Sequence, residues 1–343
     1  MIEGAPVFAR PVGGTRLIRQ IRRRSPVILW ALLALCGVLA GCAAPAGAVA
    51  DRRGTDGTSL LEPWGDISGG LLTSDFGQTS PRYVTFVRPT SVAARGNFVY
   101  VVDTGARRIY RYDRTTRRLT AYTQLAPGAD WEIYAAPDMT VYLSEPAARR
   151  IAHYDWNGML INTFSDDANL GRPTAFAVDE ATGEVLVADG LYHQVVGFNP
   201  LGAAVSVIRP CGEKAVGMDS MTAMALTRDE IYLVDRIAKR VVVQQRRSAA
   251  CRVLGEDDLT DPGAIAVDRF RRVYVGDNYD DTIKVFSPDG RLLAQYGGSG
   301  AGPSHFNHIA GLWIDANVLY VADSLNGRIG MLLITPQPTK GEK

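Results

Sequence analysis

A ten-residue pattern that occurs six times without gaps constrains the fold of this chain more than any other feature. Each copy begins with Tyr or Leu, carries an acidic residue at its fourth position and ends with Ile or Val. The copies are YVVDTGARRI from Tyr100, YLSEPAARRI from Tyr142, LVADGLYHQV from Leu186, YLVDRIAKRV from Tyr232, YVGDNYDDTI from Tyr274 and YVADSLNGRI from Tyr320. By subtraction, the acids are 42, 44, 46, 42 and 46 residues apart, at Asp103, Glu145, Asp189, Asp235, Asp277 and Asp323. Such a period is typical of propellers and other arrays of similar units.

A second pattern precedes the first in every unit and keeps nearly the same period. It reads RPTSVAA from Arg88, RPTAFAVD from Arg172 and DPGAIAVD from Asp261. Weaker copies are DWEIYAA, SMTAMAL and HIAGLWID, which begin at Asp130, Ser220 and His308. Two unrelated patterns with one period indicate a structural repeat rather than chance.

Within each unit the pattern is that of short strands. In the first unit, residues 91–93, 98–102 and 108–112 are runs of β-branched, aromatic and small residues separated by Gly, Asp and Asn. No window keeps the helical period for three turns. We therefore predict an all-β fold, a six-bladed β-propeller of four-stranded antiparallel blades.

The ends of the repeat predict how the ring closes. The sixth unit supplies strands at 312–314, 319–321 and 328–334 but no fourth strand. Residues 82–87 (RYVTFV) form a strand that belongs to no unit. We expect this N-terminal strand to complete the last blade, which would leave no open edge in the ring.

The first residues are typical of a targeting segment. An arginine-rich region ends at Arg24, and the apolar run from Val27 to Val38 is short for a membrane-spanning helix. The four residues LAGC that end at Cys42 resemble the bacterial lipobox, which implies cleavage before Cys42 and a lipid on its thiol. An uncleaved anchor and ordinary secretion are the alternatives.

These features predict four segments. Residues 1–41 are a lipoprotein signal peptide, and residues 42–60 are a lipidated flexible tether of small and polar residues. Residues 61–336 form the propeller, and residues 337–343 are a polar tail.

The charge balance of the mature part excludes a nucleic-acid partner. Six Arg of the 37 basic residues and Glu3 of the 36 acidic residues precede Cys42. The remainder carries 37 − 6 = 31 basic and 36 − 1 = 35 acidic residues, so no basic surface is expected.

The repeat resembles that of the NHL-repeat family of six-bladed propellers. That family combines a Pro-x-Gly-Ile-Ala-Val-Asp strand, a Val-Tyr-Val-Ala-Asp strand and an Asn-x-Arg-Ile turn. Residues 261–286 and 308–329 match it best, and the glycine-rich link 297–311 is also similar to the family's connector. The resemblance covers about residues 80 to 335. It implies a propeller that often acts as a non-catalytic scaffold.

The repeated acid is interpreted as structural. A carboxylate at the same place in every blade is typical of a turn in which it accepts hydrogen bonds from backbone N–H groups. Residues 277–281 (DNYDD) lack the ligand spacing and glycine of a calcium loop. The four histidines form no zinc-protease motif. We predict no metal site and no cofactor.

The residues just before each first strand differ between blades, and we expect them to converge at one mouth of the central channel. The candidate ligand-binding residues are Arg88, Asp130, Trp131, Arg172, Asp261 and His308, with Glu132 beside them. The alternative is a set of solvated residues that pair with one another across the ring.

Apart from Cys42, the mature chain contains two cysteines. Cys211 and Cys251 lie in the fourth-strand regions of consecutive units. In an oxidising compartment they could form a disulfide, but their registers differ, so two buried free thiols are the alternative.

Two classes of function remain. The first is a lipid-anchored, non-catalytic binding module on the periplasmic side of the outer membrane, with a protein, peptide or glycan partner and a place in an export or surface-assembly complex. The second is a metal-assisted lyase that resembles the amidating or streptogramin lyases. This sequence matches no motif of those lyases beyond the repeat. If the chain is such an enzyme, Arg88, Arg172 and His308 would carry the chemistry.

Overall fold

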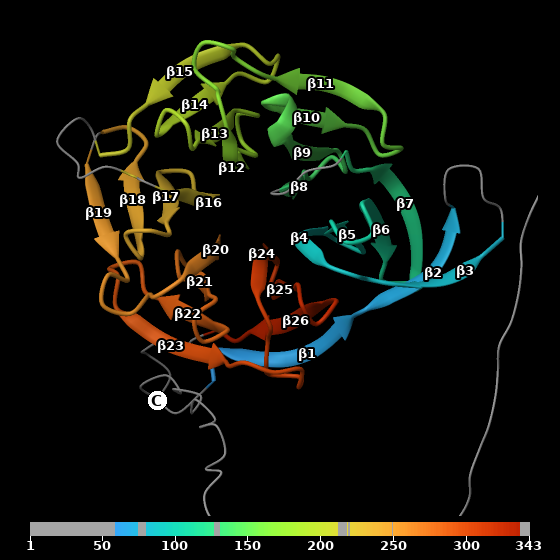
Figure 1. The fold of residues 1–343 in the computed structure, drawn as a ribbon. Helices are drawn as coiled ribbons and strands as arrows, with labels where there is room; N and C mark the ends of the chain where they lie inside the picture. The colour runs from blue at the N-terminus through green and yellow to red at the C-terminus, as the bar shows by residue number, and fades with distance from the viewer. Residues whose placement is uncertain are drawn as a thin grey trace, which may run out of the picture. The chain divides into compact units, whose positions relative to one another are not determined.

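The computed structural model describes residues 59–74, 80–126, 131–211, 218, 220–248 and 250–336. They form six antiparallel four-stranded blades around a central axis, which confirms the predicted all-β propeller (Figure 1). One short 3₁₀ helix, η1 (Pro146–Ala148), is the exception to strands and turns in the described part. In this part of the chain, no helix is long and apolar enough to span a membrane.

The first two strands of each blade contain the two sequence patterns. The innermost strands are β4 (Pro89–Arg95), β8 (Ile133–Ala135), β12 (Pro173–Val178), β16 (Met221–Leu226), β20 (Pro262–Val267) and β24 (Ile309–Asp315). The second strands are β5 (Phe98–Asp103), β9 (Val141–Glu145), β13 (Val185–Asp189), β17 (Glu230–Asp235), β21 (Val273–Asp277) and β25 (Val318–Asp323).

The outer two strands complete each blade. The third strands are β6 (Arg108–Asp113), β10 (Arg150–Tyr154), β14 (Gln194–Phe198), β18 (Arg240–Gln245), β22 (Thr282–Phe286) and β26 (Arg328–Ile334). The fourth strands are β7 (Arg118–Gln124), β11 (Leu160–Phe164), β15 (Ala204–Ile208), β19 (Cys251–Leu254), β23 (Leu292–Gly297) and β1 (Leu61–Ile67).

An N-terminal strand closes the ring as expected, but it is not the strand predicted. Strand β1 pairs with β26, from Leu61 opposite Ile334 to Ile67 opposite Ile329. Residues 82–85 instead form β3 (Arg82–Thr85), which pairs with β2 (Gly69–Ser74). Strand β2 runs parallel to β7, so this hairpin extends the first blade outward (Figure 1). The prediction failed because residues 61–67 contain Pro and Gly and lack the β-branched alternation of residues 82–87.

The core lies between neighbouring blades. Each strand of the repeated pattern is apolar on both faces, and the aromatic first residues Tyr100, Tyr232, Tyr274 and Tyr320 are fully buried. One cluster joins Ala175 and Leu186 of the third blade to Met221 and Leu233 of the fourth. Burial contributes roughly 25 cal/mol per Å² of apolar surface, so these contacts stabilise the packing of each blade against the next.

Four of the six repeated acids, Asp103, Asp189, Asp277 and Asp323, act as the turn caps that the sequence predicts. Both carboxylate oxygens of the buried Asp103 accept hydrogen bonds, from the N–H groups of Val87, Arg88 and Ala106 at 2.8, 2.9 and 3.0 Å. Asp189 accepts four such bonds, including those from Gly171 and Arg172. In each case the acid ties the second strand to the residues before the first strand.

The second blade departs from this rule. Its acid, Glu145, pairs with Arg150 at 2.5 Å and accepts a hydrogen bond from the Tyr154 hydroxyl at 2.7 Å. The next residue, Pro146, has no N–H group to donate and begins η1. The loss of the cap therefore coincides with the Pro that makes this repeat unusual in sequence.

The two cysteines form a disulfide. Cys211, which follows β15, is bonded to Cys251 at the start of β19, 40 residues later. The bond joins the outer edges of the third and fourth blades. Of the two alternatives, the paired one is therefore correct in this structure.

Candidate functional site

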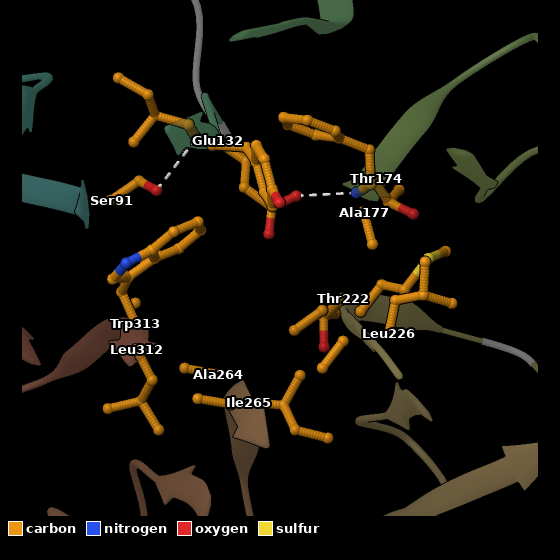
Figure 2. A pocket seen from close by; sticks show the side chains of 18 of the residues that line it. Ser91, Glu132, Thr174, Ala177, Thr222, Leu226, Ala264, Ile265, Leu312 and Trp313 are labelled. Carbon is orange, nitrogen blue, oxygen red and sulfur yellow. Dashed lines mark hydrogen bonds between the residues drawn. The ribbon is translucent and has the colours of Figure 1, made fainter. Parts of the chain in front are cut away.

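The six innermost strands surround a central cavity of about 1850 Å³. Its lining includes one residue at the same strand position in every blade: Val92, Ile133, Phe176, Met224, Ile265 and Leu312. Apolar side chains such as Leu226, Ile265 and Leu312 alternate with polar ones such as Thr222 and Glu132 on the wall (Figure 2). The lining also includes charged groups such as Arg88 and Arg172 at one end and Arg95 and Glu180 at the other. Concave sites that combine apolar walls with placed polar groups are the usual sites of ligand binding.

One end, which we name the Arg88 mouth, lies where the innermost strands begin. Arg88, Arg172, Ser220, Arg236 and His308 come from four blades and all line the cavity there. The sequence therefore predicted the convergence of Arg88, Arg172 and His308. It did not predict Arg236, which follows the acid of the fourth repeat instead of preceding the first strand.

The caps of the repeat hold the backbone of this mouth in place. Asp103 accepts the N–H of Arg88, Asp189 that of Arg172, and Asp277 that of Asp261 at 2.8 Å. The carboxylates thus position the residues that differ between blades.

The two arginines predicted from the sequence differ in how firmly they are held. Arg172 Nη2 donates to the Gly190 carbonyl oxygen at 2.9 Å, and a Cβ on Gly190 would lie 2.8 Å from that nitrogen. The guanidinium of Arg172 therefore lies over a position that only glycine leaves open. The Arg88 side chain makes no hydrogen bond or ion pair with any described residue and is exposed at the mouth.

His308 is half-buried at the Arg88 mouth with a left-handed backbone, φ 64°. Its N–H donates to Asp281 Oδ1 at 2.8 Å, which fixes the backbone before β24. Burial lowers the pKa of His308 below its usual range, and the positive charges of Arg88 and Arg236 lower it further. The imidazole is therefore neutral at pH 7.

The remaining sequence candidates differ in their placement. Asp261 does not line the cavity, because it pairs with Arg236 at 2.5 Å on the rim. This contact joins the neighbouring fourth and fifth blades and is not a pairing across the ring. Trp131 does line the cavity, but it is only 6% exposed and most of its side chain packs in the core between the first two blades. Asp130 lies outside the described residues, as does Cys42.

Glu132, which the sequence placed only beside the site, is an acid of the cavity wall; three further acids, Asp179, Glu180 and Glu184, lie at the opposite end. Oε2 of Glu132 accepts the N–H of Phe176 on β12 at 2.9 Å (Figure 2). Burial raises the pKa of Glu132 to about 8, and the Phe176 N–H offsets part of the rise. A charged residue inside the DWEIYAA copy, where other blades have Ser, Ala or Gly, was the signal that could have identified it.

The opposite end, which we name the Glu180 mouth, is crossed by ion pairs. Arg95 of the first blade pairs with Glu180 of the third, and the Tyr134 hydroxyl donates to the same carboxylate at 2.8 Å. Arg246 of the fourth blade pairs with Asp179 and Glu184 at 2.5 and 2.6 Å. These contacts leave the carboxylates of this end already engaged with protein cations.

Within the described ranges, no group of three or more His, Cys, Asp or Glu side chains is arranged to hold a metal ion. At the Arg88 mouth, the described side chains present guanidinium donors beside a half-buried imidazole.

The fold and the cavity define the chain as a six-bladed β-propeller with a central ligand-sized cavity. No protein-family model and no curated protein matches the sequence. The chain is similar in structure to virginiamycin B lyase from Staphylococcus aureus, with a TM-score of 0.54, 11% identity and coverage of 73% of this chain and 96% of that one.

Two further solved structures have the same fold. One is a streptogramin B lyase, with a TM-score of 0.57, 9% identity and coverage of 80% and 97% of the two chains. The other is a protein of unknown function from Bacteroides thetaiotaomicron, with a TM-score of 0.60, 15% identity and coverage of 80% and 75%. At these identities the likeness concerns the fold alone.

Proposed function

We propose that this chain is a lipid-anchored, NHL-type propeller of the bacterial cell envelope that binds a protein, peptide or glycan partner through the Arg88 mouth. The observation that carries the proposal is the convergence of Arg88, Arg172 and His308 at one mouth of the cavity, whereas the carboxylates of Asp179, Glu180 and Glu184 lie at the other mouth. At the Glu180 mouth, by contrast, the guanidinium groups of Arg95 and Arg246 already form ion pairs with carboxylates of the protein.

Two features support the proposed location in the cell envelope. The LAGC sequence at Cys42 follows an apolar run, as a lipobox does. The Cys211–Cys251 disulfide fits a compartment outside the reducing cytoplasm. Acyl chains on Cys42 would add roughly 0.8 kcal/mol of membrane affinity per buried methylene.

The binding proposal is tested by photo-crosslinking in intact cells. A benzoylphenylalanine at Thr104, which lines the Arg88 mouth, is expected to form an adduct with a partner or ligand. The matched control is Leu201, which is 86% exposed in a turn away from the cavity. An adduct at Leu201 but not at Thr104 would refute binding at this mouth.

A lyase is the second candidate, and the placement of His308 beside Arg88 favours it. A neutral imidazole can accept a proton while a guanidinium stabilises negative charge that develops on the substrate. One of the similar structures is a catalytically inactive virginiamycin B lyase from Staphylococcus aureus with quinupristin. Turnover of quinupristin by the purified chain, abolished in His308→Ala but not in His305→Ala, would establish this function. An intact substrate after prolonged incubation with divalent cations would reject it for this substrate class.

A further inference from the structure

The wall of the cavity shows which polar groups a ligand would meet. An innermost strand has a neighbour on one side only, so alternate N–H groups on its other edge point towards the cavity. In the second blade, the N–H of Ile133 donates to Ser91 Oγ of the first blade at 3.2 Å. In the third blade, the N–H of Phe176 donates to Glu132 of the second in the same way (Figure 2).

The other four blades lack such an acceptor. Ser91 pairs with the third residue of the repeated pattern, and the residues with the same pairing elsewhere are Ala175, Ala223, Ala264 and Gly311. None of these side chains can accept a hydrogen bond. The register therefore directs four edge N–H groups towards the cavity, and no side chain among the described residues accepts them. They belong to Met224, Ile265, Leu312 and Val92.

The acids near the Arg88 mouth do not compete for these donors. Asp103 and Asp189 are fully buried, and backbone N–H groups occupy their oxygens. Asp261 is paired with Arg236 on the rim. A ligand at this mouth thus meets the donors of Arg88 and Arg172 first and backbone N–H donors farther along the wall.

The carboxyl group of Glu132 is a further polar group that a ligand in the cavity would meet. A serine performs the same cross-blade contact in the first blade, so the contact itself does not require a carboxyl group. Oε1 of Glu132 makes no hydrogen bond to a described residue. A protonated Glu132 would present one more neutral donor to the cavity, whereas an ionised one would repel a negative ligand.

We propose that the ligand of this cavity carries an oxyanion, a carboxylate or a phosphate, which Arg88 and Arg172 bind at the mouth while the wall N–H groups and Glu132 face it from inside. The inference rests on the proposed function, because it names the chemical class of the ligand that this mouth receives. Guanidinium groups bind both oxyanions through paired N–H donors.

The test uses the purified full-length chain in detergent, with citrate and inorganic pyrophosphate as separate probes in titration calorimetry at pH 7. At least one probe is expected to bind, and the stronger probe distinguishes the carboxylate from the phosphate source. Arg88→Gln is the decisive variant, because this side chain makes no described contact that the fold needs. We expect it to weaken binding by about tenfold or more.

The matched control is Arg247→Gln, at the Glu180 mouth of the same cavity. It should leave the affinity unchanged. Equal losses in both variants, or no binding of either probe, would overturn the inference. A Thr104 adduct in cells without anion binding would overturn this inference and leave the proposed function standing.

The pH dependence supplies an independent arm. Ionisation of Glu132 between about pH 7 and pH 9 should weaken anion binding in the wild type, and Glu132→Gln should remove this dependence. Of the other groups that face the cavity, burial lowers the pKa of His308 and raises that of Tyr134, so both are neutral in this window. The carboxylates of Asp179, Glu180 and Glu184 are paired with Arg95 and Arg246. A wild-type affinity that does not change up to pH 9 would contradict the role given to Glu132.

Discussion

At the scale of single residues, Glu230 shows how this fold tolerates a fully buried charge. Its carboxylate contacts the guanidinium groups of Arg252 and Arg271 and accepts hydrogen bonds from Tyr232 at 2.5 Å and Gln245 at 2.7 Å. Burial alone would raise the pKa of Glu230, but these contacts, led by Arg252, lower it to about 2. Such a network stabilises only when every member is present.

We therefore expect Glu230→Gln to destabilise the propeller at pH 7 by about 3 kcal/mol, the value of the pKa difference between about 4.5 and about 2. Because the folded pKa is depressed, this stability is present above the unfolded pKa and is lost as the pH falls through about 2. Urea unfolding at pH 7 and pH 3 measures it. The exposed Glu62 supplies the control, since Glu62→Gln should change little. An equal loss for Glu230→Gln at both pH values would contradict the linkage.

Residue roles were predictable where the repeat imposes them. The capping of Asp103, Asp189 and Asp277 follows from their regular spacing and is confirmed. The roles of Trp131 and Asp261 were not predictable, because each depends on a side chain from another blade. Contacts between blades depend on the packing angle, which the local pattern does not encode.

At the scale of elements, the disulfide joins two outer strands that otherwise have free edges. Cys211 follows β15 and Cys251 begins β19, so the bond fastens the third blade to the fourth at the rim. Outer strands have fewer buried residues than inner ones; in β15 the pattern is exposed or intermediate throughout. The covalent link therefore reinforces the part of these blades that packing holds least.

Loss of this bond should cost about 4 kcal/mol, the chain-entropy value for a link 40 residues apart. The double variant Cys211→Ser, Cys251→Ser should unfold at lower temperature than the wild type in calorimetry. Reduction of the wild type with a thiol should reproduce that temperature, and the same thiol should not affect the double variant. A double variant as stable as the oxidised wild type would exclude a structural role for the bond.

The elements themselves were largely predictable, since alternating short runs and turn residues mark the strands of each unit. The exception is the closing strand, where residues 61–67 carry only two buried side chains, Leu61 and Ile67. A strand held by its ends and by backbone pairing leaves little hydrophobic pattern in the sequence.

At the scale of the whole molecule, the ring depends on those two side chains. Leu61 packs in the cluster between the fifth and sixth blades, and Ile67 packs in the cluster between the sixth and first. Without β1, the edge of β26 would be open to pairing with other chains.

The double variant Leu61→Ala, Ile67→Ala should lose about 2 to 5 kcal/mol per site and form oligomers in size-exclusion chromatography. The control is Glu62→Ala on the same strand, whose side chain is exposed. If the double variant stays monomeric and as stable as the control, closure by β1 does not hold the ring together.

The pairing of β1 with β26 also sets an order of events. Leu61 leaves the ribosome among the first residues of the propeller, and its partner Ile334 is among the last. The ring therefore cannot close until nearly the whole chain has been synthesised, because contacts between distant residues form late. This delay keeps the ring open until its final blade has been made.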